Sequence, residues 1–124
     1  MLDQISISDC KKYIQIICNK KSEIKDIKET ILHIMPISKG SGIDKVYIDE
    51  RDRDYPLSSI ECLQIATFLT ETTSNQMKFA ALIDEPVSSR ELFIGAVSSK
   101  GGEISYFNEK ATALTWLLSE IADH

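Results

Sequence analysis

Short apolar runs alternate along this chain with segments in which apolar residues recur every three or four positions. The first pattern is typical of β-strands and the second of amphipathic helices. We expect strands at 4–8, 13–18, 46–48, 77–83 and 104–107, and helices at 22–35, 59–70, 88–97 and from 109 onward. Strands that alternate with helices predict a mostly parallel sheet with right-handed crossovers. The chain is therefore expected to form an α/β fold with a mixed β-sheet, in which an initial hairpin supplies the antiparallel pair.

Helix boundaries can be predicted from capping residues. The residues expected to cap helix starts are Ser22, Ser58 with Glu61, Ser88 with Glu91, and Asn108. The two Ser-x-x-Glu pairs are the pattern of a capping box, in which each residue satisfies a free backbone N–H of the other. Pro36 is expected to end the first helix, because proline cannot continue the hydrogen-bond ladder. The run from Phe79 to Ile83 is apolar on both faces, which predicts a buried parallel strand.

Length, charge and cysteine usage restrict the class of protein. The chain has 124 residues, so residues 1–124 are expected to form a single domain. A formal net charge of −5 disfavours a nucleic-acid partner, because polyanions reward positive charge. Three cysteines without a Cys-x-x-Cys pair (Cys10, Cys18 and Cys62) fit reduced thiols in a cytoplasmic protein. No apolar run is long enough for membrane insertion.

Catalytic motifs are not evident. His33 is the one internal histidine, and its position opposite the isoleucine stripe of the first helix predicts that it faces water. The sequence offers no evident Ser-His-Asp or Cys-His arrangement and no glycine-rich phosphate-binding loop. We therefore expect no catalytic residue and no cofactor. Trp116 is expected to pack at the edge of the core, with a contact in a homodimer as the alternative.

An acidic segment follows the third expected strand. Asp49, Glu50, Asp52 and Asp54 could supply oxygen ligands to a hard cation such as magnesium. Arg51 and Arg53 alternate with these acids and can neutralise them locally. An ion-paired, solvated loop is therefore the preferred interpretation, and no metal site is predicted.

Four segments carry a resemblance to a known family. They are Lys45–Arg51, a strand ending in Asp-x-Arg; Leu57–Ser59, which opens a helix; Lys78–Leu82; and Tyr106–Leu117, with its Phe-x-x-x-x-x-Ala-x-x-Trp-Leu pattern. Together they resemble SpoIIAA-like proteins, a family related to the STAS domains. The resemblance extends over residues 43–118 in motif and over the whole chain in the order of its elements.

The resemblance implies a SpoIIAA/STAS-like β-α superhelix and several candidate residues. Related domains include phosphorylatable antagonists of anti-sigma factors, which implies Ser58 and Ser59 as candidate phosphoacceptors. Those relatives place an aspartate before the modified serine, whereas here Leu57 precedes Ser58. A plain helix N-cap is therefore the preferred interpretation of Ser58. The resemblance also makes Asp49, Arg51 and Lys100 candidate contacts to a ligand or partner, with Lys100-Gly101 standing where many members have Arg-Gly.

Three functional hypotheses follow. The first is a non-enzymatic regulatory or protein-binding module that acts through a protein partner. The second, implied by the more distant CRAL-TRIO-type domains, is a carrier of a small apolar ligand, which an apolar pocket of several hundred Å³ would favour. The third is a metal-assisted enzyme that uses the acidic segment 49–54.

Overall fold

The computed structural model describes residues 3–52 and 57–119. Two strands are followed by alternating helices and strands, with a short 3₁₀-helix, η1, before α3. The elements are β1 (Gln4–Ile7), β2 (Ile14–Ile17), α1 (Ile24–Ser41), β3 (Lys45–Asp49), α2 (Ser59–Thr73), β4 (Lys78–Leu82), η1 (Val87–Arg90), α3 (Glu91–Ser99), β5 (Glu103–Phe107) and α4 (Lys110–Leu117). Each strand and helix predicted from the sequence is present, with boundaries that differ by a few residues.

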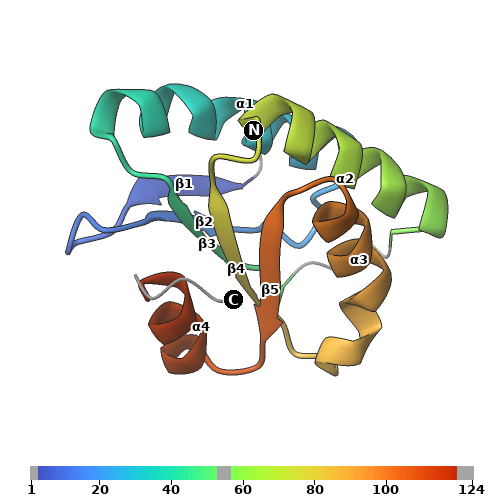
Figure 1. The fold of residues 1–124 in the computed structure, drawn as a ribbon. Coiled ribbons are helices and arrows are strands. Elements are labelled where there is room, and N and C mark those ends of the chain that lie inside the picture. Colours follow the sequence, from blue (N-terminus) through green and yellow to red (C-terminus); the bar gives the residue numbers. More distant parts are fainter. Residues whose placement is uncertain (1–2, 53–56, 120–124) are drawn as a thin grey trace.

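The strands form a five-stranded sheet in their order along the chain, β1-β2-β3-β4-β5. β1 and β2 form the antiparallel hairpin, and β2, β3, β4 and β5 run parallel. Figure 1 shows the sheet between helices: α1, α2 and α3 lie on one side, and α4 lies on the other. The predicted mixed sheet of a single-domain α/β fold is confirmed.

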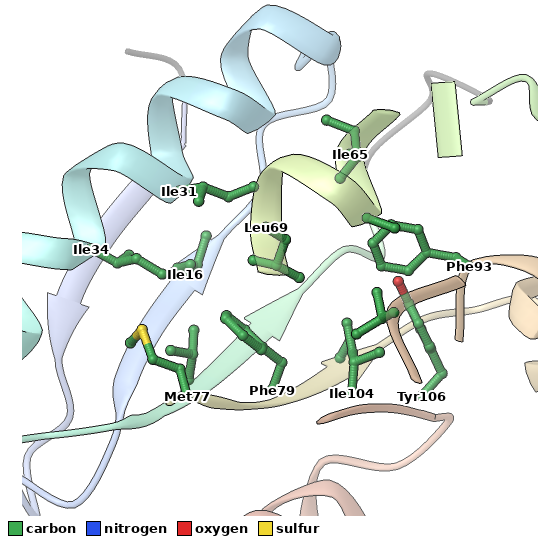
Figure 2. Close-up of a cluster of buried hydrophobic side chains, with 14 of the residues drawn as sticks. Ile16, Ile31, Ile34, Ile65, Leu69, Met77, Phe79, Phe93, Ile104 and Tyr106 are labelled. Carbon is green, nitrogen blue, oxygen red and sulfur yellow. The ribbon is translucent and has the colours of Figure 1, made fainter. Parts of the chain in front are cut away.

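The face of the sheet under α1, α2 and α3, here called the three-helix face, holds the larger core. Ile16, Val46, Phe79 and Ile104 belong to this cluster of buried side chains. Figure 2 shows sheet side chains pointing toward Ile31 and Ile34 of α1 and Leu69 of α2. The isoleucine stripe of the first helix therefore packs on the sheet, as its helical spacing predicts.

The other face, here called the α4 face, holds a smaller core. Tyr47, Ala80 and Leu82 alternate with the residues that face the three helices, and they pack against Ala113 and Leu117 of α4. Burial on both faces explains why β4 is apolar throughout. Trp116 packs at the edge of this core, with its ring 5.6 Å from that of Phe107 and the Lys78 ammonium 4.2 Å above it.

The first helix differs from the prediction at both ends. Ser22 is buried and does not cap it; Glu23 is the N-cap and forms a capping box with Asp26. The expected stop at Pro36 is wrong, because α1 continues through the proline to Ser41 and ends at Gly42, which has a positive φ of 77°. Partly buried Ile37, one residue beyond the proline, packs against the core. This tertiary packing offsets the missing hydrogen bond of the proline.

Two other predicted caps are also corrected. Ser88 and Glu91 do not form a capping box, because residues 87–90 form η1 and α3 begins only at Glu91, with Arg90 as its N-cap. Asn108 does not cap α4, whose N-cap is Glu109. Its side-chain amide instead donates hydrogen bonds to the carbonyl oxygens of Ile83 and Glu85, at 3.0 and 2.8 Å. It therefore ties the end of β5 to the loop after β4.

Tyr47 leads to a prediction of increased stability. Its side chain is buried on the α4 face, and its hydroxyl oxygen is the one buried side-chain polar atom without a hydrogen-bond partner among the described residues. Burial, together with the negative charge of Asp49, raises the pKa of Tyr47 to about 12. An unsatisfied buried hydroxyl is costly, so Tyr47→Phe is expected to raise the free energy of unfolding by about 1 kcal/mol. Urea unfolding measures this, with Tyr13→Phe as the matched control; a clear loss of stability in Tyr47→Phe would contradict it.

Candidate functional site

A pocket of about 470 Å³ lies between the sheet and the three helices that cover it. All of α1, α2 and α3 contribute to it, together with four of the strands and the loops at the carboxyl ends of the parallel strands. Its volume is within the usual range for small-molecule sites in proteins. This pocket is the candidate functional site.

The wall of the pocket is apolar. Its aliphatic and aromatic lining residues are Ile16, Ile27, Ile31, Ile34, Ile48, Leu57, Ile65, Leu69, Phe79, Leu92, Phe93, Ile104 and Tyr106. Figure 2 shows several of them converging from the sheet and from the helices. Such a wall can hold a hydrocarbon body by burial of apolar surface, and it offers no group that would react with it.

The polar part of the lining is centred on Arg90, at the end of η1. Its guanidinium lies 3.1 Å from a carboxylate oxygen of Glu85 and 3.9 Å from one of Glu50. It also lies 5.6 Å from the ring centre of Tyr106, in a cation–π contact. Glu50 follows β3 and Glu85 follows β4, so the Arg90 side chain links the carboxyl ends of neighbouring parallel strands.

These neighbours fix the charge state of Arg90. Burial lowers its pKa, but the hydrogen bond that Arg90 donates to Glu85 and the charge of Glu50 outweigh this effect and raise the pKa above its ordinary value. Arg90 is therefore always cationic. The Cys62 thiol also lines the pocket, and burial raises its pKa despite the opposing charge of Arg90. Cys62 is thus a neutral thiol and not an activated nucleophile.

Asp3 supplies a further carboxylate to the lining, beneath the start of α1. It is buried, and it accepts hydrogen bonds from the Asn19 backbone N–H at 2.9 Å and the Thr30 hydroxyl at 2.9 Å. The buried Ser22 hydroxyl donates a third, longer bond at 3.5 Å. Ser22, expected to be a helix cap, therefore acts in this buried network.

The two candidate phosphoacceptors lie at the start of α2. Ser58 is the N-cap: its Oγ accepts a hydrogen bond from the Glu61 N–H at 3.2 Å, and the Glu61 carboxylate accepts one from the Ser58 N–H at 3.0 Å. The capping box predicted from Ser-x-x-Glu is confirmed. Ser59 is the first residue of α2, is exposed and lines the pocket. Phosphorylation of either serine stays a prediction.

Substitutions at Ser58 separate a cap from a phosphoswitch. Ser58→Ala is expected to lower the free energy of unfolding by about 1 kcal/mol, because it removes the cap. Ser58→Asp is expected to cost little, because aspartate caps a helix about equally well and its charge suits the helix dipole. Thermal unfolding and a pull-down from cell extract with wild type and both variants test this. A partner that distinguishes Ser58→Asp from wild type would show that Ser58 does more than cap α2.

The candidate contact residues Asp49, Arg51 and Lys100 do not form one site. Asp49 and Arg51 form a bidentate ion pair, with nitrogen–oxygen distances of 3.0 and 2.8 Å. The hydrogen bonds from Arg51 hold the pKa of Asp49 below its ordinary value. Lys100 caps the end of α3, before β5 begins, and so lies at the opposite end of the parallel strands. Each stays a candidate by itself.

The acidic segment is described only in part, because Arg53 and Asp54 lie outside the described residues. Asp49 points to the α4 face with Tyr47, whereas Glu50 lines the pocket on the three-helix face. Within residues 3–52 and 57–119, no group of three or more histidine, cysteine, aspartate or glutamate side chains could hold a metal ion. The pairing of Asp49 with Arg51 is the ion pair expected from the alternating charges.

The remaining sequence features are the internal histidine, the three cysteines and the lack of a long apolar segment. His33 is exposed, as predicted, and its Nδ1 lies 2.8 Å from the Glu29 carbonyl oxygen. Cys10, Cys18 and Cys62 are free thiols. Among the helices of the described residues, none has the length and the apolar content that crossing a bilayer requires.

Arg90, Glu85 and Asp3 are lining residues that sequence reasoning did not single out. Glu85 and Arg90 are five residues apart, whereas Asp3 is distant from both. The three follow no recognised motif, so only the fold brings them together in one lining. The one available signal was positional, since Glu50 and Glu85 each follow a predicted parallel strand closely. In open α/β sheets, ligands bind outside the carboxyl ends of strands.

Comparison with known proteins identifies the fold. No family model matches the chain, and no curated protein matches it. One similar solved structure is the protein TM1081, determined by NMR, at 13% identity and a TM-score of 0.59, over 94% of this chain and 88% of that one. Another is an uncharacterized protein of the DUF3478 family from Shewanella loihica PV-4, described as having a SpoIIAA-like fold. It has 22% identity and a TM-score of 0.57, over 93% of this chain and 91% of that one. The chain therefore has the SpoIIAA-like α/β fold that its sequence motifs predicted.

Proposed function

We propose that this domain is a non-enzymatic binding module, and that its ligand is a small, largely apolar molecule held in the pocket under α1, α2 and α3. The observation that carries the proposal is the pocket itself: about 470 Å³, lined mostly by aliphatic and aromatic side chains. Well-packed interiors leave few spaces of this size, and this one opens to the surface beside the exposed residues Ser59 and Leu92, so that a ligand can enter it. Apolar pockets with a few convergent polar groups are the usual form of a ligand site.

The chemistry of the lining supports binding rather than reaction. Cys62 is kept as a thiol by its raised pKa, and Arg90 is engaged by two carboxylates. Ser59 and Ser89 also line the pocket, but none of the described lining residues is a histidine that could activate their hydroxyl groups. A nucleophile would need an adjacent base or a lowered pKa. Such a lining supports orientation of a bound molecule.

A second candidate is a regulatory domain that acts through a protein partner. The observation that favours it is exposed apolar surface on α2 and α3: Ile60 is 68% exposed, and Leu63 and Leu92 are about half exposed. Leu92 also lines the pocket, so this surface adjoins its opening. Exposed apolar residues beside a pocket are frequent at interaction sites.

Native mass spectrometry of the protein purified from its own host tests the proposal. The expected result is a bound species of a few hundred daltons that organic solvent extracts. Leu69→Trp enlarges a side chain that lines the pocket and should abolish this species. Leu114→Trp makes the same substitution on α4, on the far side of the sheet, and should retain it. A protein that carries no small molecule but binds a stoichiometric protein partner would favour the second candidate.

A further inference from the structure

We infer that the molecule held in this pocket has a neutral or cationic polar end, and that carboxylates and phosphates are excluded. The inference rests on the proposed function and adds the chemical class of the ligand. Among the described residues, three carboxylates line the pocket, those of Asp3, Glu50 and Glu85, against one guanidinium, that of Arg90. This described part of the polar lining therefore carries an excess of negative charge.

Among the described lining residues, Arg90 is the one cation that could attract an anion, and its charge is already engaged. Glu85 lies 3.1 Å from it and Glu50 3.9 Å. The Glu50 side chain is only 9% exposed, so its charge is weakly screened by water. An anionic ligand that displaced Glu85 from Arg90 would separate this carboxylate from the guanidinium that it contacts at 3.1 Å. The loss of that ion pair offsets the new contact between the ligand and Arg90.

Helix N-termini are the other usual source of attraction for anions, and here acidic side chains already occupy them. α1 and α2 both begin near the carboxyl end of the sheet. At α1 the capping box is formed by Glu23 and Asp26, and at α2 by Ser58 and Glu61. The free N–H groups and the positive end of each helix dipole therefore meet carboxylates of the protein itself. They offer little to a phosphate or carboxylate of a ligand.

The carboxylates that disfavour an anion favour a neutral or cationic head group. A hydroxyl or an ammonium can donate hydrogen bonds to the Glu85 carboxylate, which is about half exposed, without displacing Arg90. The hydrocarbon body of the ligand would lie against Phe79, Ile104 and the helices above them. An amphipathic molecule such as a long-chain alcohol or amine satisfies both parts of the lining.

Displacement of a neutral fluorescent probe, N-phenyl-1-naphthylamine, by three ligands with one chain length tests the inference. Decanol is added below its solubility limit, and decylamine and decanoate are added below the concentrations at which they form micelles. The expected result is that decanol and decylamine displace the probe, while decanoate is at least about tenfold weaker than decanol. Added salt should narrow this difference, because part of the repulsion is screened.

Charge-neutral variants identify the source of the selectivity. In Glu50→Gln/Glu85→Gln, decanoate should gain affinity relative to decanol, because Arg90 becomes available to it. Glu103→Gln removes the same kind of charge from an exposed residue at the amino end of β5, and should leave the selectivity unchanged. Equal or tighter binding of decanoate by wild type would overturn the inference and leave the proposed function standing. Failure of all three ligands and of the probe to bind would overturn the proposed function as well.

Discussion

Phe79→Ala is expected to lower the free energy of unfolding by about 3–5 kcal/mol. Phe79 lies in β4, is 3% exposed, and packs under the helices of the three-helix face. Truncation removes a large apolar contact between the sheet and these helices and leaves a cavity that relaxation fills only in part. Domains of this size have a total stability of about 5–15 kcal/mol, so the variant is expected to unfold far more easily.

Urea unfolding followed by circular dichroism measures the effect of Phe79→Ala as a lower midpoint with an unchanged dependence on denaturant. Phe79 also lines the pocket, so the folded fraction of the variant should still bind an apolar probe, in an enlarged space. A loss below about 1 kcal/mol would contradict the packing described for this face.

Leu117→Ala is expected to lower the free energy of unfolding by about 2–5 kcal/mol, because it disrupts the smaller core on the α4 face. Leu117 is fully buried in the last turn of α4, in the cluster that contains Tyr47, Ala80 and Leu82. α4 has only eight residues, and a helix this short depends on packing for its stability. Loss of the leucine side chain should therefore detach α4 before the rest of the fold is lost.

The matched control for Leu117→Ala is Leu32→Ala, at a residue of α1 that is 54% exposed. This control should change the stability by less than about 0.5 kcal/mol. Because Leu117 lies outside the pocket, the affinity of folded Leu117→Ala for an apolar probe should equal that of wild type. A loss of affinity larger than the unfolded fraction explains would show that α4 and the pocket are coupled, contrary to the two-core arrangement.

Much of the fold could be predicted because local pattern and tertiary structure agree. The apolar residues of β4 alternate between two faces, and both faces are buried. Ser58 and Glu61 spell a capping box, and both of its hydrogen bonds are present. In these cases the residues that make the interaction are neighbours in sequence, so the pattern contains the whole interaction.

The wrong predictions occur where distant residues decide a local choice. Local rules predict that a helix ends at Pro36, but the packing of Ile37 against the core stabilises α1 beyond the proline. Ser22 is a good cap by composition, yet Asp3 draws its hydroxyl into a buried network. Asn108 reaches back to carbonyl groups after β4 rather than forward into α4.

The candidate site could be predicted least. Its polar lining joins Asp3, Glu50, Glu85 and Arg90, which come from three separate segments of the chain. In the sequence, Glu50 is only one member of an acidic run that is expected to form an ion-paired, solvated loop. The structure separates them, because neighbouring residues at a strand end point to opposite faces: Asp49 pairs with Arg51, and Glu50 lines the pocket.

The most direct test of the central claim, that the pocket binds a small apolar molecule, is an NMR titration of isoleucine methyl groups with decanol. Isoleucine is well placed for this measurement: Ile16, Ile31, Ile65 and Ile104 line the pocket, whereas Ile7 and Ile17 are exposed and do not line it. The account predicts saturable shifts of the four lining residues, with Ile7 and Ile17 unmoved. Shifts that do not saturate, or that are confined to exposed isoleucines, would contradict it.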